Sequence, residues 1–387
     1  MKTLARSRKA PGFTLVELMV AITIGLIILA VISQVYVGSK RTYRVQEGLS
    51  RLQENGRYAV DFLGRDIRMA GYMGCVGTSA TLNNIANPIV GWTPLTAAIP
   101  PTLKGIFGYE KADIAGMAPA GFPVKPAEVK DNTDLIVIQH FSATGAKVFT
   151  PVSPPPTTAE VKISGNSLGF QQYEVLIVSD CVSADFFKAT TVSNSAGIVT
   201  IAHSTSNNTS NNTSKPYNAN AEIMRMETSV YYISSGAVAN GCPADSLCRK
   251  RLGFYLTGDP NAWCTNATAG TIQGFCVEQV AEGVEDMQVL YGVNGSGSAN
   301  HTADRFVDAA AITTDDCSIS QICWPNVVSA RINLLLRTVD ATVSPEPLLA
   351  YPASQIPLFD GFPPAIATPR AYRRVYTETV VLRNRAL

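Results

Sequence analysis

The chain has 387 residues, of which 46% are hydrophobic and only 16% charged, so it can bury a sizeable core. Its 31 basic and 30 acidic residues nearly cancel, and no overall basic excess points to nucleic acid as a partner. The eight cysteines never show the C-x-x-C spacing, which disfavours a zinc ribbon or a thioredoxin-like redox site.

The first 37 residues combine a basic leader with a long apolar segment. Four basic residues precede Gly12, and the run from Leu18 to Val37 has 20 residues without a charge. That length crosses about 30 Å of hydrocarbon as a helix. No small-x-small cleavage site follows it, so the segment does not read as a secretory signal peptide. The leader bases place the N-terminus in the cytoplasm and the bulk of the chain across the membrane.

An amphipathic segment continues the helix beyond the membrane. Apolar or small residues recur every three or four positions from Val45 to Ile67. We therefore predict one helix over 13–69, apolar all round in its first half and packed on a globular domain in its second. Gly71 and Gly74 would end it. The glycines expected to let it approach a sheet closely are Gly48, Gly56 and Gly64.

Glu17 is an acid placed five residues into the apolar stretch. An ionised carboxylate buried in lipid or in a helix bundle costs several kcal/mol unless it is paired. If the chain is cut after Gly12, Phe13 carries a free α-amine about 6 Å away along the axis. A neighbouring helix shifted by that amount would bring its amine to this carboxylate, so Glu17 would set the register of assembly. The alternative is an interfacial acid stabilised by the helix dipole.

The stretch Gly12–Glu17 (GFTLVE), after a short basic leader, resembles the class III signal of type IV prepilins. The resemblance implies that a prepilin peptidase cuts between Gly12 and Phe13 and that Phe13 becomes N-methylated. It also implies that Glu17 recruits and registers subunits in the filament core. Major pilins commonly carry a proline in this helix, and this segment has none between Phe13 and Asn87, so the resemblance does not extend to a helix that melts in the filament.

Further segments resemble the PilW family of minor pilins. They are Leu52–Ala59, Asp66–Tyr72, Val284–Gly292 and Val380–Arg385. The region 76–225 carries no such likeness. The resemblance implies a subunit stored in the inner membrane with its head in the periplasm, and later present on the pilus at the cell surface. There it would join other minor pilins and the major pilin, prime assembly at the inner-membrane platform, and could cap the tip beneath an adhesin.

The remainder of the chain predicts a β-rich head, so the expected fold class is α+β, with the long helix packed on a mostly antiparallel sheet. Residues 75–130 are rich in Gly, Pro, Ala and Thr and predict surface loops. Runs of β-branched or aromatic residues predict strands. They are Asp134–Phe141, Glu174–Ser179, Ile198–His203, Glu227–Ser234, Leu252–Thr257, Val284–Tyr291, Val327–Arg337 and Val375–Leu382. Alternation in 287–291 and 331–336 predicts a half-solvated sheet.

These segments predict four parts in chain order. They are a leader at 1–12, a transmembrane assembly helix at 13–37, an amphipathic helix at 38–72 and a disulfide-containing head at 73–387. The stiff PVSPPP connector at 151–156 could divide the head into two lobes. The SNNTSNNTS run at 206–214 predicts a polar surface loop.

All eight cysteines follow the apolar segment, as expected for disulfides in an oxidising compartment. They are Cys75, Cys181, Cys242, Cys248, Cys264, Cys276, Cys317 and Cys323. The nearest neighbours could close local loops as Cys242–Cys248, Cys264–Cys276 and Cys317–Cys323, leaving Cys75 with Cys181. Eight cysteines allow 105 connectivities, so other pairings stay open.

No constellation of residues predicts catalysis, and none predicts a cofactor. The G-x-S-x-G at 165–169 is followed by a strand-like run, so we expect a hairpin-type turn and not a nucleophile elbow. Asp315 with Asp316, and Asp304 with Asp308 on a short helix, could help to hold Ca²⁺, but solvated acidic turns are favoured. Three histidines, His140, His203 and His301, show no metal-ligand spacing. The basic C-terminal residues are Arg370, Arg373, Arg374, Arg383 and Arg385. Strand alternation would scatter them, which argues against a nucleic-acid site.

Three functional hypotheses follow from these patterns. The first is a PilW-like minor pilin, and the second is a pseudopilin of a type II secretion system, whose heads are mostly smaller and poorer in cysteine. The third is an envelope enzyme anchored by an uncut helix, against which the missing catalytic cluster weighs.

Overall fold

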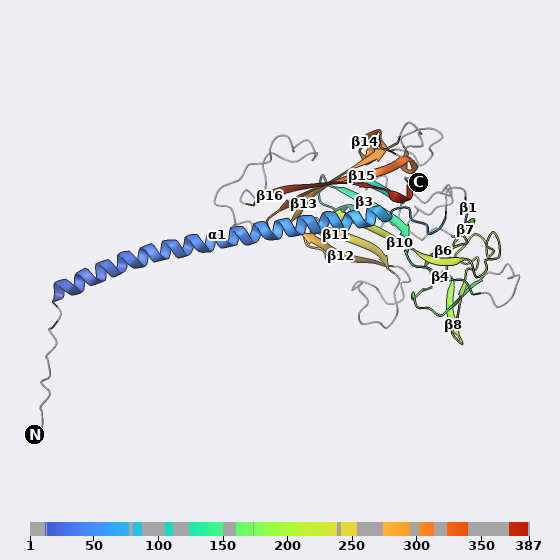
Figure 1. The fold of residues 1–387 in the computed structure, drawn as a ribbon, viewed down its shortest axis with the longest axis horizontal. Helices are drawn as coiled ribbons and strands as arrows, with labels where there is room; N and C mark the ends of the chain where they lie inside the picture. The colour runs from blue at the N-terminus through green and yellow to red at the C-terminus, as the bar shows by residue number, and fades with distance from the viewer. Residues whose placement is uncertain are drawn as a thin grey trace, which may run out of the picture.

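The computed structural model describes residues 12, 14–76, 80–86, 105–110, 124–149, 160–172, 174–237, 241–253, 274–294, 302–312, 323–339 and 371–385. It shows a long N-terminal helix and a β-rich head (Figure 1). The α+β class and the mostly antiparallel sheet predicted from the sequence are confirmed.

Helix α1 covers Leu15–Met69, 55 residues or about 80 Å at 1.5 Å per residue. It begins at Leu15 because Thr14 adopts extended backbone angles (φ −79°, ψ 152°) and acts as the N-cap. It ends where Ala70 leaves the helical region and Gly71 follows at φ +74°. The predicted helix and its glycine stop are therefore both found.

The largest sheet has nine strands. Along its main path the order is β1 (Thr81–Asn84), β7 (Ser183–Lys188), β6 (Val175–Ser179), β10 (Glu222–Ile233), β11 (Ser246–Gly253) and β12 (Gly274–Glu282). Strands β3 (Asp134–Phe141) and β4 (Ala146–Lys147) pair with β10, and β2 (Ile106–Glu110) pairs with β3. The β1–β7 pair is parallel, and the other pairs of this sheet are antiparallel. Strands on both sides of the PVSPPP segment, which itself lies outside the described residues, thus share one sheet.

The described residues of the head also form two smaller sheets. One has the order β14 (Arg305–Val307), β13 (Val284–Val293), β15 (Val327–Arg337) and β16 (Arg373–Val381). The other has the order β5 (Glu160–Ser164), β9 (Ile198–Ala202) and β8 (Thr191–Ser195). Short 3-10 turns are η2 (Pro126–Glu128), η3 (Ala309–Ala311), η4 (Trp324–Asn326) and η6 (Arg383–Arg385).

The described part of the head has two hydrophobic cores. The main core joins the second half of α1 to the nine-stranded and four-stranded sheets, and α1 contacts β15 and β16 on one side and β12 on another (Figure 1). The second core, which includes Phe170 and Phe187, is built from Ile85 and residues between 148 and 223. Figure 1 places its strand β8 at the end of the head remote from the N-terminus. Much of the region without family likeness, 76–225, therefore forms this distal part.

Several strand predictions are accurate, whereas one loop prediction and one prediction of alternating burial are wrong. Asp134–Phe141 and Val327–Arg337 match β3 and β15 residue for residue. The predicted surface loops of 75–130 contain the buried strand β2, whose Ile106 and Phe107 are 0% and 2% exposed. The half-solvated pattern holds for 287–291 within β13, although Glu285 and Asp286 just before it are both buried. It fails for β15, where Asn333 and Leu335 are buried on the face opposite Ile332. The alternation of residue types is visible in the sequence, but the burial of a strand's second face depends on which other elements pack against it.

Gly56 shows why α1 approaches the sheet so closely. A Cβ atom at Gly56 would overlap the ring of Tyr376 on β16, and one at Gly64 would lie 3.3 Å from the carboxylate of Glu378. Tyr376 also donates its hydroxyl hydrogen to Leu52 O at 3.3 Å. The expected close packing of the helix is therefore found at these two glycines.

We expect Gly56→Ala to destabilise the full chain by about 1–3 kcal/mol, because the displaced Tyr376 ring loses its packing and its hydrogen bond. The gain in helix propensity, about 1 kcal/mol, is too small to offset this. Gly38→Ala is the control, since no atom lies within 4 Å of a Cβ there. Chemical denaturation in detergent measures both variants, and a Gly56→Ala variant as stable as Gly38→Ala would contradict the packing.

Candidate functional site

The N-terminal end of α1 is closed by reciprocal hydrogen bonds between Thr14 and Glu17. The Glu17 amide donates to Thr14 Oγ1 at 3.2 Å, and the Thr14 amide and hydroxyl donate to Glu17 Oε2 at 2.9 and 3.0 Å. This capping box satisfies donors that the first turn of a helix leaves free. Gly12 is exposed just before it, and Phe13 lies outside the described residues.

Glu17 is the only charged residue between Gly12 and Lys40. Its apolar neighbours Leu15, Val16 and Leu18 are 74%, 67% and 57% exposed. In the part of the chain that the structure describes, no basic side chain forms an ion pair with Glu17. The carboxylate is therefore held by its own helix start and is accessible to a positive group on another chain.

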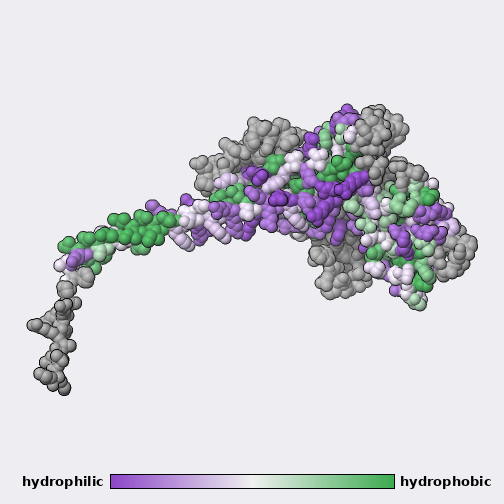
Figure 2. All heavy atoms as spheres, viewed as in Figure 1, coloured by the Kyte–Doolittle hydropathy of each residue, from purple (hydrophilic) through white to green (hydrophobic). Residues whose placement is uncertain are grey.

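The apolar half of α1 projects from the head without any cover. Among the described residues, α1 is the one helix long and apolar enough to cross a membrane, and none of its most apolar window is buried. Figure 2 shows this stretch as a continuous hydrophobic surface beyond the head. An exposed apolar surface of this size is typical of a segment that lies in lipid or packs against other helices.

The C-terminal end of α1 is fixed to the last strand and the C-terminal turn. Arg68 Nη2 lies 2.8 Å from Glu378 Oε1 on β16. Asn384 Nδ2 lies 3.5, 3.3 and 3.2 Å from the carbonyl oxygens of Arg68, Met69 and Ala70, and it caps carbonyls that the helix end leaves free. Sequence reasoning missed Asn384, because a capping side chain more than 300 residues away leaves no local signal.

A second contact joins α1 to the nine-stranded sheet. Asp66 accepts the hydroxyl hydrogen of Tyr231 on β10, and Arg249 Nη1 on β11 lies 3.3 Å from Asp66 Oδ2. The Arg249 guanidinium also pairs with Glu278 and lies 4.8 Å from the ring centre of Phe62. Together with the β16 contacts, this fixes how the projecting half of the helix leaves the head.

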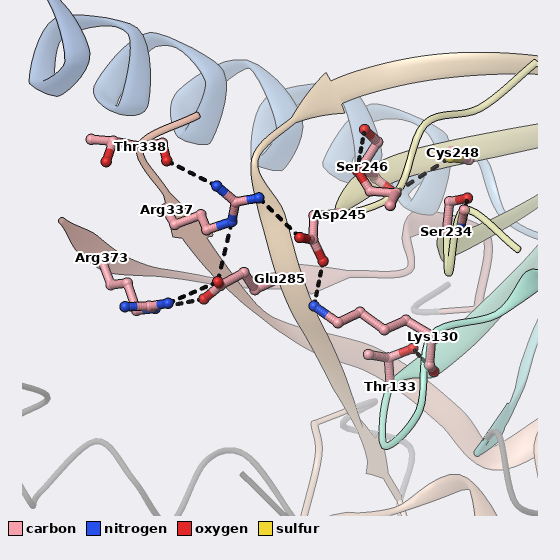
Figure 3. A network of polar contacts seen from close by, with 12 residues as sticks. Lys130, Thr133, Ser234, Asp245, Ser246, Cys248, Glu285, Arg337, Thr338 and Arg373 are labelled. Atoms are coloured by element: carbon pink, nitrogen blue, oxygen red, sulfur yellow. Dashed lines mark hydrogen bonds and ion pairs between the residues drawn. The ribbon is translucent and has the colours of Figure 1, made fainter. Parts of the chain in front are cut away.

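A chain of ion pairs links the two larger sheets (Figure 3). Lys130 Nζ lies 2.5 Å from Asp245, whose other oxygen lies 3.0 Å from Arg337 Nη2. Arg337 Nε lies 3.2 Å from Glu285, which also takes two contacts from Arg373 at 2.6 and 3.0 Å. The Arg373 side chain is only 3% exposed. Two carboxylates are shared among three basic side chains, so every charge in the network has an opposite partner and the network joins the two sheets.

The basic C-terminal residues that the structure describes do not gather into one patch. Arg373 belongs to the ion-pair chain, and Arg374 lies over the ring of Tyr376 at 5.4 Å. Arg383 is exposed on η6, Arg370 lies outside the described residues, and the side chain of Arg385 is not described. The expected scattering therefore holds for the described members of the set.

Two disulfides are present among the described residues. Cys75 is bonded to Cys181 across 106 positions, and Cys242 to Cys248 across six. The first joins the segment after α1 to the turn between β6 and β7 in the distal part of the head. Cys323 is also disulfide-bonded. Cys264 and Cys317 lie outside the described residues, as does the side chain of Cys276.

The remaining candidate metal-binding residues do not come together as a site in the described ranges. Asp304 and Asp308 flank strand β14, so the expected short helix that would bring them together is wrong. No group of three or more potential ligands gathers in the described residues, and Asp315, Asp316 and His301 lie outside them. These residues therefore give no positive support for a bound Ca²⁺.

The G-x-S-x-G segment connects two sheets, and His140 and His203 make contacts within the head. The segment at 165–169 carries the chain from β5 in one sheet to β6 in another, so it is not the hairpin turn expected. A strand follows it, and an elbow would need a helix. His140 Nδ1 lies 3.0 Å from Phe141 O, and His203 is fully buried 4.6 Å from the ring of Phe187. The polar run 206–214 is mostly exposed, as predicted, apart from the buried Asn208 and Thr213. Asn208 bonds to the backbone of Lys188.

Buried carboxyl groups are a feature that the sequence did not predict. Burial raises the pKa of Asp134 to about 8, although its Oδ2 accepts a hydrogen bond from the Val289 amide at 2.8 Å. Burial also raises the pKa of Asp286 to about 7. Both folded-state values lie above the usual 3.8, so the folded chain binds more protons than the unfolded chain at neutral pH. Their stability contribution is complete below about pH 4 and is lost as the pH rises toward 8.

We expect the free energy of unfolding to fall between about pH 5 and pH 8, by at most about 1.4 kcal/mol per pH unit for each such group. Asp134→Asn keeps an acceptor for Val289 and removes the titration, so its stability should fall less over that range. The control is Asp61→Asn on the exposed face of α1, where the Asp61 side chain is 56% exposed. Urea denaturation of the full chain measures the slopes, and equal slopes for Asp134→Asn and the parent would contradict the assignment.

Comparison with known families gives two matches. A family model described as type IV pilus-assembly protein W matches residues 230–384, which run from the second half of β10 to η6. A model described as the prokaryotic N-terminal methylation motif matches residues 7–33, which include the Thr14–Glu17 capping box and most of the apolar segment. Comparison with curated proteins and with solved structures found no match.

Proposed function

Since the chain belongs to the PilW family of type IV pilus-assembly proteins, and is a type IV minor pilin, we propose that it helps to start pilus assembly. In this proposal a prepilin peptidase cuts between Gly12 and Phe13, Phe13 is methylated, and the mature subunit joins other minor pilins. The observation that carries the proposal is the lone, capped Glu17 at the start of an uncovered apolar helix, inside the matched methylation motif.

The proposed role of Glu17 follows from electrostatics in a medium without water. Cleavage creates a positive amine at Phe13, four residues from the carboxylate. Each charge alone is costly in an apolar bundle, and pairing them between neighbouring helices removes much of that cost. Because the amine precedes the acid by four residues on each chain, the pairing between two helices also selects their axial stagger. The work of the protein is then non-covalent.

The proposed location follows from the helix and the disulfides. Before assembly the helix lies in the inner membrane with the head in the periplasm, where the Cys75–Cys181 and Cys242–Cys248 bonds can form. After extraction the subunit is part of the pilus. The distal part of the head, built largely from 76–225 outside both family matches, is the proposed surface for a neighbouring minor pilin or a tip adhesin.

Co-purification tests this function. A C-terminally tagged full chain, cross-linked in its own cells and purified, should bring down other proteins that carry the same methylation motif. Cells that lack the gene should have few or no pili. Recovery of secretion-system components, with normal piliation of the deletion strain, would favour a type II secretion pseudopilin and contradict the proposal.

A further inference from the structure

Three basic residues follow the apolar run without acidic partners. Lys40, Arg41 and Arg44 are exposed, and within the described ranges no ion pair joins any of them to a carboxylate. Two turns further on, Arg51 differs, since its Nη2 lies 2.7 Å from Glu47 Oε1. These three unpaired bases therefore lie together in the neck between the apolar segment and the head.

The axial position of these bases matches a bilayer surface. Val37 ends the uncharged run, and Lys40, Arg41 and Arg44 lie about 5, 6 and 10 Å beyond it along the helix. The polar layer of a bilayer extends about 5–8 Å beyond the hydrocarbon on each side. Lys40 and Arg41 thus lie at the depth of the lipid headgroups, and the long Arg44 side chain can reach back to them.

Two tyrosines accompany the bases on one side of the neck. Tyr36 and Tyr43 are 65% and 66% exposed, and their spacing of seven places them on the same helix face, with Lys40 between them. Tyrosine is enriched at membrane–water interfaces, where its ring lies among the headgroups. Among the described residues, Leu49 is the first residue of α1 that packs against the main core, so the described part of the head leaves Tyr36–Tyr43 accessible. Arg44, at the end of the neck, is exposed and lines a cavity with Arg337 and Val339.

We propose that the neck, Tyr36–Arg44, is an interfacial anchor whose bases bind the phosphate groups of anionic phospholipids in the leaflet nearest the head. The inference rests on the proposed membrane-stored state of the subunit. The three unpaired positive charges are complementary to the negative lipid phosphates. The two tyrosine rings fix the depth of the neck in the headgroup layer. The anchor holds the head at a set height above the bilayer, and its contacts have to break when the subunit leaves the membrane for a filament.

Lipid selectivity measures this binding directly. The full chain is reconstituted in phosphatidylcholine vesicles, and spin-labelled phosphatidylglycerol or phosphatidylcholine reports which lipid associates with it. The parent should prefer phosphatidylglycerol about fivefold or more, the effect of a single basic residue at an anionic surface. The triple variant Lys40→Gln, Arg41→Gln, Arg44→Gln should lose the preference. Arg51→Gln is the matched control and should keep it. Added salt should weaken the preference, because it screens exposed charges.

Incorporation into the vesicles is measured in the same samples by resistance to alkaline extraction. A chain that inserts but shows no lipid preference, or a triple variant that keeps it, would overturn the anchor and leave the pilin function intact. A chain that fails to insert would overturn the anchor together with the membrane-stored state.

Discussion

Replacing Glu17 by Gln should leave cleavage after Gly12 intact and reduce recovery of the chain with its partner pilins by at least about tenfold. Gln can still complete a capping box with Thr14, so the helix start is preserved and only the charge is lost. The partner amine would then lie unpaired in an apolar bundle, and loss of one member of a buried pair commonly costs about 3–5 kcal/mol. Quantitative mass spectrometry of the co-purified pilins measures the loss.

The control for this variant is Glu47→Gln, an acid on the same helix beyond the apolar segment. Glu47 pairs with Arg51 on an exposed surface, where an ion pair contributes about 0–1 kcal/mol, so co-purification should stay close to that of the parent. Normal recovery of Glu17→Gln with its partners, or equal losses for the two variants, would contradict a special role for the acid in the apolar segment.

The second large effect is expected at the disulfide that ties the distal part of the head to the end of α1. Replacing Cys75 and Cys181 together by Ser should destabilise the full chain by about 5 kcal/mol, because this bond closes a loop of about a hundred residues in the unfolded state. Denaturation of the purified, oxidised protein in detergent measures the change.

The matched comparison is the Cys242→Ser, Cys248→Ser double variant. That bond spans six positions, and the same loop-closure argument gives about 2 kcal/mol. The account expects the Cys75/Cys181 variant to be clearly the less stable of the two. The reverse order would show that the long-range bond does not constrain the chain as the structure indicates.

The long helix could be predicted from the sequence because its signals are local. A run without charges, a regular apolar spacing and the glycine at Gly71 each depend on neighbours within a few residues, and α1 covers the predicted range apart from its first two positions. The Thr14–Glu17 spacing carries the capping box as well, although the sequence was interpreted only through the charge of Glu17.

The arrangement of the head could not be predicted in the same way, because its determinants are distant in sequence. Strand β2 is five residues long and depends on pairing with β3, and Asn384 caps a helix that ends at Met69. Asp134 lies on a correctly predicted strand, yet its raised pKa follows from burial against residues of β13. In each case the decisive partner is supplied by tertiary packing.

The central claim is that the chain is a prepilin whose maturation exposes the amine of Phe13. Mass spectrometry of the N-terminal peptide, from protein extracted from the membranes of its own cells, tests this most directly. The account predicts a peptide that begins with N-methylated Phe13. A mature protein that still begins at Met1 would contradict it.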